Sequence, residues 1–147
     1  MRPYKVYAIK HGTVIDHIDS GNALKVVKIL KLDEYDQIVT VGIGLESKKM
    51  GKKDIVKIEN KSLTKTELNK IALIAPHATI NIIQEFKVAQ KFEVALPQFM
   101  ENLIKCPNPQ CISRNEDIYS KFYKHSLNPL KVRCHYCERV FDSFSLI

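Results

Sequence analysis

The stretch 106-CPNPQC-111 decides how this chain is interpreted, because it holds two of only four cysteines in 147 residues. The other two cysteines lie in 134-CHYC-137, so the pattern is C-x4-C followed, after 22 residues, by C-x2-C. Zinc prefers four tetrahedral ligands, and two short loops that each supply two thiolates meet that preference. Pro107 and Pro109 restrict the unfolded chain where the ligands must converge. The spacing therefore predicts one zinc ion held by Cys106, Cys111, Cys134 and Cys137.

This predicted zinc site is structural rather than catalytic, because four thiolates leave no coordination position for water. A segment of about 42 residues buries too little surface to be stable alone, so metal binding and folding should be coupled. The alternative is four free or disulfide-bonded cysteines. In a reducing compartment, paired cysteines at this spacing favour the metal. His125 and His135 lie nearby, and we expect His135, between two ligands, to face solvent.

The composition predicts a folded chain, and the lack of a membrane-spanning or signal-peptide pattern makes the cytoplasm its expected location. Hydrophobic residues make up 45% of the chain and charged residues 27%, which is enough apolar surface for a core. The sequence shows neither a run of about 18 apolar residues nor a signal-peptide pattern, so we expect no membrane association. The net charge of +7 favours anionic partners but does not select among them.

The pattern of apolar residues and turn signals predicts two small domains. Thr64 and Glu67 form a capping box ahead of the second helix, which Pro76 ends. Ser20 or Asn22 is available to cap the first helix. The expected elements are strands at 4–10 and 13–18 joined by a turn at His11-Gly12, a helix within 20–32, strands at 37–47 and 54–60, a helix from 65, and strands at 78–84 and 85–95.

These elements give the order ββαββαββ, in which two helices cover one face of a largely antiparallel sheet. This is an α+β fold with a ferredoxin-like arrangement. The proline-containing stretch after it leads directly to Cys106, so we place the boundary near residues 97–100. The predicted domains are residues 1–97 and a small all-β zinc domain at residues 101–147.

The motifs of common enzymes are missing from the sequence: it contains no phosphate-binding loop, nucleophile elbow or metalloprotease helix. Asp16 and His17 are adjacent, so on a regular strand they would face opposite sides. A nucleotide hydrolase that uses this pair is therefore disfavoured. The sequence predicts a chain with no catalytic residues.

Lysines recur on or beside the predicted strands, at Lys10, Lys53, Lys57 and Lys91, with His17 and Asn81 on other strands of the same sheet. From the pattern alone, a solvated sheet face is the favoured interpretation. Several cations that converge on one point would instead suit a polyphosphate.

Five phrases of the sequence carry a resemblance to a known family. They are IKHGTVIDHI, MGKKDIVKIEN, IALIAPHATIN, CPNPQCIS and CHYCERVF, and they extend over nearly the whole chain. In this order, and with both cysteine spacings, they resemble the regulatory chain of aspartate carbamoyltransferase.

The resemblance implies a nonenzymatic subunit that regulates pyrimidine biosynthesis. It implies an N-terminal allosteric domain that binds nucleoside triphosphates, with CTP as inhibitor, ATP as activator and UTP acting beside CTP in some members. The C-terminal zinc domain would dock on the catalytic chain, and homodimers of regulatory chains would bridge catalytic trimers.

The resemblance also implies which residues form the nucleotide site. Lys91 and His17 would lie at the phosphates, Asp16 and Lys57 near the ribose, Ile9, Asn81 and Phe86 around the base, and Ala8, Lys10, Val14 and Val88 along the pocket, with Lys53 as a further candidate. Phe86 stands where the family leads us to expect tyrosine, so a hydroxyl contact is lost while ring packing can remain. His11 similarly replaces an expected arginine.

A zinc ribbon that binds nucleic acid is the main alternative. It is favoured by the pI of 9.2 and by the interleaved cations and aromatic residues of Lys121, Phe122, Tyr123 and Lys124. However, residues 106–147 carry six basic and four acidic side chains, a net charge of only +2 before any thiolate is counted. That is little charge for following a phosphate backbone. We therefore expect no nucleic-acid partner.

Overall fold

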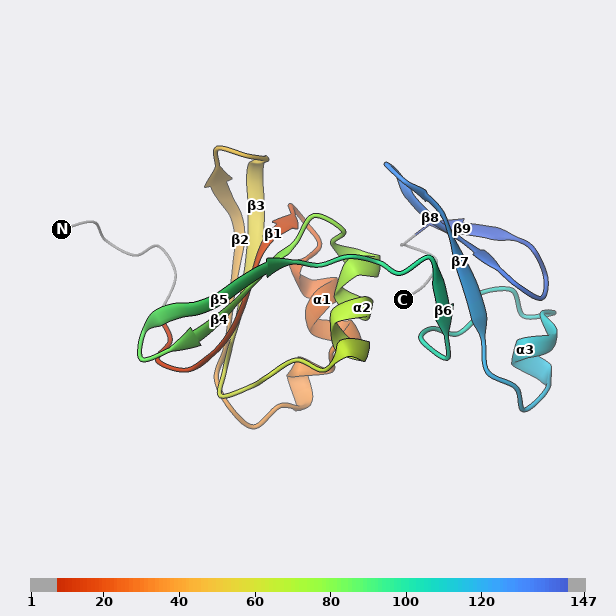
Figure 1. Ribbon diagram of the computed structural model, residues 1–147, viewed down its shortest axis with the longest axis horizontal. Coiled ribbons are helices and arrows are strands. Elements are labelled where there is room, and N and C mark those ends of the chain that lie inside the picture. The colour runs from red at the N-terminus through yellow and green to blue at the C-terminus, as the bar shows by residue number, and fades with distance from the viewer. Residues whose placement is uncertain (1–7, 143–147) are drawn as a thin grey trace. The chain divides into compact units, whose positions relative to one another are not determined.

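The computed structural model of the chain describes residues 8–142 (Figure 1). The chain divides into two compact units, a first unit that ends at Val94 and a second unit that begins at Ala95. The sequence predicts the change of domain slightly later, at residues 97–100. Each unit is described by itself below.

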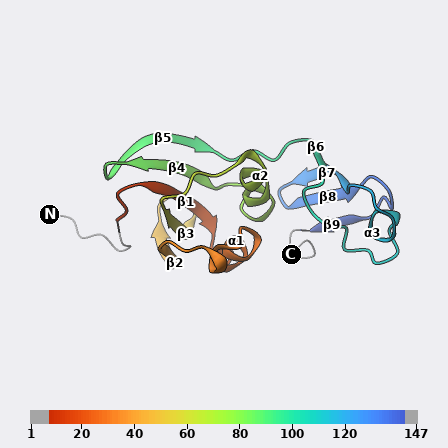
Figure 2. The same ribbon diagram turned by 90° about the horizontal axis from the view of Figure 1, so that it is seen from below.

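The first unit is an antiparallel five-stranded sheet with both longer helices on one face, as Figures 1 and 2 show. Its elements are β1 (Gly12–Asp19), α1 (Ala23–Ile29), the 3-10 helix η1 (Leu32–Glu34), β2 (Val39–Ser47), β3 (Gly51–Glu59), α2 (Lys65–Ile74), β4 (Thr79–Gln84) and β5 (Lys87–Glu93). The strand order is β2-β3-β1-β4-β5, and every neighbouring pair is antiparallel. A βαββαβ unit with this order is ferredoxin-like, with β5 added at one edge. The predicted α+β class is confirmed.

The core of the first unit lies between the sheet and the two helices. The side chains that fill it are less than 2% exposed, and they include Ile15, Ile18, Val26, Val56, Ile58, Ile71, Leu73 and Ile80. Burying each such side chain contributes about 1.5–3 kcal/mol. Because strand residues alternate between faces, this core leaves Val14 and Asp16 of β1 for the opposite face.

The start of the chain differs from the predicted hairpin. Residues 4–7 of the expected first strand lie outside the described residues, and Ala8 to Lys10 form no strand. Instead, the Lys10 carbonyl accepts a hydrogen bond from the Phe86 N–H at 3.0 Å. Gly12, expected in a turn, begins β1 with a φ of +143°. A Cβ at this position would collide with the backbone carbonyl oxygen of Ile58, so the close strand contact requires glycine.

The helix α2 begins as predicted. The Glu67 N–H donates to Thr64 Oγ1 at 3.2 Å, and the Thr64 N–H donates to Glu67 Oε1 at 3.0 Å, which completes the capping box. The helix α1 is shorter than the predicted range. It ends before Lys31, whose φ of 54° is left-handed and leads into η1.

Asn22 occupies the N-cap position of α1, as predicted, but its side chain makes no capping hydrogen bond. The buried Asp54 of β3 takes this role instead. Its Oδ2 accepts from the Gly21 N–H at 2.8 Å and from the Ala23 N–H at 3.1 Å, while its Oδ1 accepts from the Gly44 N–H at 2.9 Å. One carboxylate therefore ties the start of α1 to an irregularity in β2.

The second unit is a four-stranded antiparallel sheet in the order β6-β7-β8-β9. Its elements are β6 (Phe99–Glu101), α3 (Ile112–Asn115), β7 (Lys121–Leu127), β8 (Leu130–Cys134) and β9 (Val140–Asp142). The structure thus agrees with the predicted all-β domain and adds one four-residue helix after Cys111. Among residues 8–142, the structure has no helix that is both long and apolar enough to cross a membrane.

Candidate functional site

The four cysteines of the second unit come together as the spacing predicts. The Sγ atoms of Cys106, Cys111, Cys134 and Cys137 all lie within 4.8 Å of one another. Two of the separations are 3.8 Å, between Cys106 and Cys137, and 3.6 Å, between Cys111 and Cys134. Zinc–sulfur bonds of about 2.3 Å in a tetrahedron place sulfurs about 3.8 Å apart, whereas a disulfide places them about 2.05 Å apart. The donor set fits one structural zinc ion.

The loops around the thiols orient them with backbone and hydroxyl donors. The Asn108 N–H donates to Cys106, and the N–H groups of Tyr136 and Cys137 donate to Cys134. The Ser113 Oγ lies 3.0 Å from Cys111 Sγ. Donors of this kind favour the thiolate form and fix the direction of each ligand.

Burial opposes the ionisation of these thiols. It raises the pKa of the Cys106 thiol and the pKa of the Cys134 thiol. Burial also acts to raise the pKa of Cys111, but hydrogen bonds with Ser113, Cys134 and Cys106 together outweigh it and lower that pKa to about 7. Four thiolates side by side need a compensating charge, which a divalent cation supplies when it is bound.

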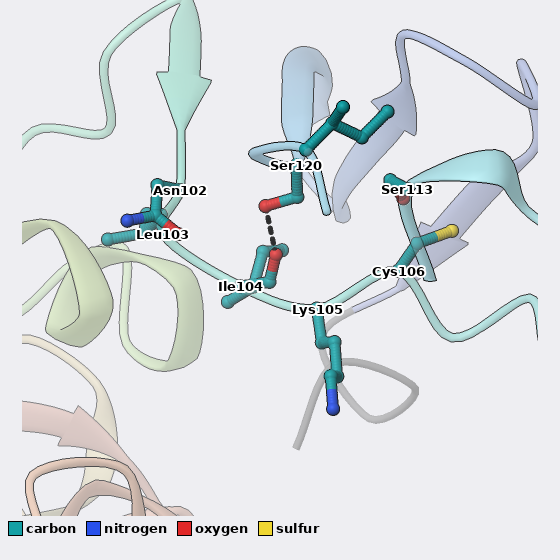
Figure 3. Close-up of a pocket in the computed structure, with 8 residues that line it drawn as sticks. Asn102, Leu103, Ile104, Lys105, Cys106, Ser113 and Ser120 are labelled. Carbon is teal, nitrogen blue, oxygen red and sulfur yellow. Dashed lines mark hydrogen bonds between the residues drawn. The ribbon is translucent and has the colours of Figure 1, made fainter. Parts of the chain in front are cut away.

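A hollow adjoins the metal centre, with Cys106 in its wall (Figure 3). The Ser120 hydroxyl donates a hydrogen bond to the Ile104 carbonyl, and the Lys105 side chain points away from this pair. The bond connects the segment before Cys106 to the residue before β7, which steadies the approach to the first ligand. As predicted, His135 is exposed; its Nδ1 lies 3.2 Å from the Tyr123 hydroxyl.

In the first unit, the face of the sheet away from the helices brings the predicted nucleotide residues together. The strand register aligns Lys57, Val14, Asn81 and Lys91 as neighbouring Cα partners across β3, β1, β4 and β5. Directly opposite partners point to the same face of a sheet. Residues that are far apart in sequence therefore form one row, which we call the cross-strand row.

One end of this face is apolar. Ile9 and Ile83 lie there, in a buried cluster that continues through Val14 to Ile55 and against which Leu45 packs. Val88 is the Cα partner of Ile83, and Phe86 lies in the turn between β4 and β5. Phe86 is 65% exposed and Val88 is 57% exposed. Ala8 is half-buried and Lys10 is exposed beside this turn.

The other end of the face is cationic. Lys53 Nζ lies 2.8 Å from Asp16 Oδ1, and both side chains are 19% exposed. The Nδ1 atom of His17 lies 3.0 Å from the Thr79 hydroxyl oxygen. Thr79 is the Cα partner of Asp16.

These contacts correct the prediction that Asp16 and His17 face opposite sides. The register of β1 shifts between Ile15 and Ile18, and His17 has a φ of 56° within this irregularity. A bulge of this kind breaks the alternation of side chains. It turns the imidazole towards Thr79 and thus to the side that carries Asp16.

Burial lowers the pKa of His17; Asp16 opposes this effect, while Lys53, Lys49 and Lys91 add to it. Burial also lowers the pKa of Lys57, although the negative charge of Asp16 acts to raise it. Burial is thus the main cause of both shifts, and for His17 the nearby charges of Lys53, Lys49 and Lys91 add to it, which places these cations close to the imidazole. The arrangement can hold a polyphosphate at this end and an apolar ring at the other.

The structure weighs against the nucleic-acid interpretation. Phe122, one of the aromatic residues that would have to stack on bases, is 0% exposed and lies in the core of the second unit. Tyr123 packs against Phe99, with ring centroids 5.3 Å apart, and carries Arg133 over its ring. The interleaved pattern is therefore the alternation of β7 between core and surface.

Sequence reasoning missed two residues that the structure makes important. Asp54 organises three backbone groups, but a single acidic residue in an apolar strand gives no local signal of distant partners. Lys49 lies in the turn between β2 and β3, and only the fold brings it to Glu93, 3.8 Å away, and near His17.

Both halves of the chain match known families. Residues 4–95 match the family described as aspartate carbamoyltransferase regulatory chain, allosteric domain, and residues 98–146 match the metal binding domain of the same chain. Relatives with the name aspartate carbamoyltransferase regulatory chain are similar over their full length. Those of Pyrococcus abyssi and Pyrococcus furiosus are 50% and 52% identical, with 100% of this chain and 98% of each relative covered.

A relative from a third organism agrees. The regulatory chain of Chromobacterium violaceum is 47% identical over 93% of this chain and 91% of its own length. The four-cysteine geometry falls within the part that matches the metal binding domain. The chain belongs to the family of aspartate carbamoyltransferase regulatory chains, and it is accordingly a regulatory, non-catalytic subunit whose partner is the catalytic chain.

Proposed function

We propose that this chain binds nucleoside triphosphates on the open face of its first sheet and passes their effect to the catalytic chain. The observation that carries the proposal is the cross-strand row, which lies between an apolar end at Ile9 and a cationic end at His17. A nucleotide has the same division, with a flat base at one end and phosphates at the other.

The base lies at the apolar end in this proposal, against Ile9, Asn81 and Phe86, with Ala8, Lys10, Val14 and Val88 along the pocket. The ribose lies at Asp16 and Lys57. The phosphates lie at His17 and Lys91, with Lys53 close by. Burial is the main cause of the lowered pKa of His17, and Lys53, Lys49 and Lys91 add to it; a bound anion offsets this second, electrostatic part.

In this proposal, CTP inhibits the enzyme complex, ATP activates it, and UTP acts together with CTP. A nucleotide shifts an enzyme complex only if it binds one quaternary state more tightly than another. The ring of Phe86 offers stacking without a hydroxyl group, so it packs on either base.

The second unit acts as the adaptor to the catalytic chain, and its zinc ion is required for assembly. Regulatory chains pair as homodimers that bridge catalytic trimers, in the cytoplasm and within pyrimidine biosynthesis. The buried thiols support the requirement for zinc, because Cys106, Cys111 and Cys134 are at most 1% exposed and the cation they hold becomes part of the core.

Calorimetric titration of the zinc-loaded chain with CTP and ATP tests the nucleotide site. The Lys91→Ala variant should bind both at least about tenfold more weakly, a loss of about 1.4 kcal/mol. Lys87→Ala is the matched control, since Lys87 is also an exposed β5 lysine but lies outside the cross-strand row. Equal affinity of Lys91→Ala and the unmodified chain would rule out this site.

Size-exclusion chromatography with purified catalytic trimers tests the adaptor. Cys111→Ser should abolish the complex, whereas Lys91→Ala should assemble normally. A complex formed by Cys111→Ser without bound zinc would show that the metal is not required for docking.

A further inference from the structure

A second hollow lies in the first unit, at the Asp19 end of β1. It lies where the β1–α1 turn, the β2–β3 turn and the loop before β4 meet, and we call it the terminal hollow. Its lining consists of Asp19, Ser20, Lys49, Met50, Lys52 and His77. None of these residues belongs to the nucleotide site proposed above.

The terminal hollow carries a positive charge that is available to a ligand. Lys49, Lys52 and His77 are exposed, and Asp19 is the only acidic residue in the lining. The Nζ of Lys49 lies 3.8 Å from Glu93 Oε1, but these two side chains are 56% and 75% exposed. An ion pair with this exposure contributes little, so the Lys49 ammonium can turn towards an anion at small cost.

The terminal hollow also continues the line of the proposed phosphate positions. Lys52 is adjacent to Lys53, and Lys53 is the Cα partner of Asp19 in the hollow. Lys49 of the hollow forms an ion pair with Glu93, and Glu93 is the Cα partner of Thr79. The Thr79 hydroxyl in turn contacts His17, so Lys49 and His17 lie near the same strand positions. From Gly12 to Asp19, β1 therefore passes first the apolar end of the sheet face, then the proposed phosphate position at His17, and finally the terminal hollow.

We propose that the terminal hollow receives the terminal phosphoryl group of nucleoside polyphosphates that are longer than triphosphates. This inference rests on the proposed function, because it requires the base at Ile9 and the first phosphates at His17. Each added phosphoryl group brings another negative charge and further acceptor oxygens, which Lys49 and Lys52 meet as point charges. The chain then distinguishes effectors by the length of their phosphate chain as well as by their base.

A comparison of the affinities for ATP and for adenosine 5′-tetraphosphate tests this inference. Both are titrated into the zinc-loaded full chain by calorimetry, at fixed ionic strength. The variants are Lys49→Ala/Lys52→Ala and, as the matched control, Lys48→Ala, which removes an exposed lysine of the same turn outside the hollow.

The unmodified chain and Lys48→Ala should bind the tetraphosphate about tenfold more tightly than ATP, a difference of about 1.4 kcal/mol. The double variant should lose this preference and keep its ATP affinity within about twofold. Equal affinities in the unmodified chain, or a double variant that keeps the preference, would overturn the inference while leaving the triphosphate site intact. If the unmodified chain binds neither nucleotide, the proposed function itself fails.

Discussion

Replacing Asp54 by asparagine should destabilise the first unit strongly, although the change only exchanges one carboxylate oxygen for an NH2 group. Asp54 is 0% exposed, and its two oxygens accept from the N–H groups of Gly21, Ala23 and Gly44. The amide of asparagine keeps one oxygen and presents an NH2 group where the other oxygen was. At least one buried N–H then faces a donor.

The magnitude follows from these three bonds. An N–H left without an acceptor costs about 1–3 kcal/mol, and each bond that keeps its oxygen but loses the charge weakens by about 1 kcal/mol. An amide is cheaper to bury than a carboxylate, which offsets part of the loss. We expect the free energy of unfolding to fall by about 3 kcal/mol.

The chain folds as two units, so the assay must report on each unit separately. Tryptophan fluorescence cannot do this, because the chain has no tryptophan. Hydrogen exchange of the β3 amides, followed by mass spectrometry, reports on the first unit, and exchange of the β8 amides reports on the second. Asp54→Asn should speed β3 exchange by about a hundredfold and leave β8 unchanged. Asp33→Asn, at an exposed acidic residue, is the control. If Asp54→Asn exchanges like the control, the carboxylate does not organise the sheet and helix as argued.

Three further predictions concern the metal, the imidazole and the helix cap. Chelation of zinc should remove the protection of β8 amides in exchange experiments while β3 stays protected; uniform loss in both units would argue against a metal that stabilises the second unit alone. The pKa of His17 is lowered, so the free chain binds fewer protons there than the unfolded chain does, and bound phosphates favour the charged form. Triphosphate affinity should therefore rise as pH falls from 8 to 6, and His17→Gln should weaken this dependence; an identical pH profile would refute the placement. Thr64→Ala should lower the stability of the first unit by about 1 kcal/mol and Thr64→Ser by less, as measured by denaturant unfolding; equal stability of all three chains would mean that the capping box contributes nothing.

The sequence predicted best what depends on short segments. The cysteine pairs are each held within one loop, so their spacing alone specifies the ligand set. The capping box at Thr64 is likewise complete within four residues. In both cases, the chemistry and its partners are neighbours along the chain.

What could not be predicted depends on register and on contacts between distant segments. The cross-strand row aligns four strands, and a shift of one residue would turn Asn81 to the other face. The bulge at His17 broke the alternation that sequence reasoning assumed, and local sequence does not mark it. Asn22 is the N-cap residue of α1, but the carboxylate that accepts the N–H groups there comes from Asp54 of β3, which is distant in sequence.

The response of the assembled enzyme to nucleotides tests the central claim most directly. Aspartate saturation of catalytic trimers reconstituted with the zinc-loaded chain should shift when CTP or ATP is added, in opposite directions for the two. With Lys91→Ala, the complex should form and the shift should disappear. If the unmodified complex has the same saturation curve with and without nucleotides, or if Lys91→Ala responds like the unmodified chain, the sheet face described here does not control the catalytic chain.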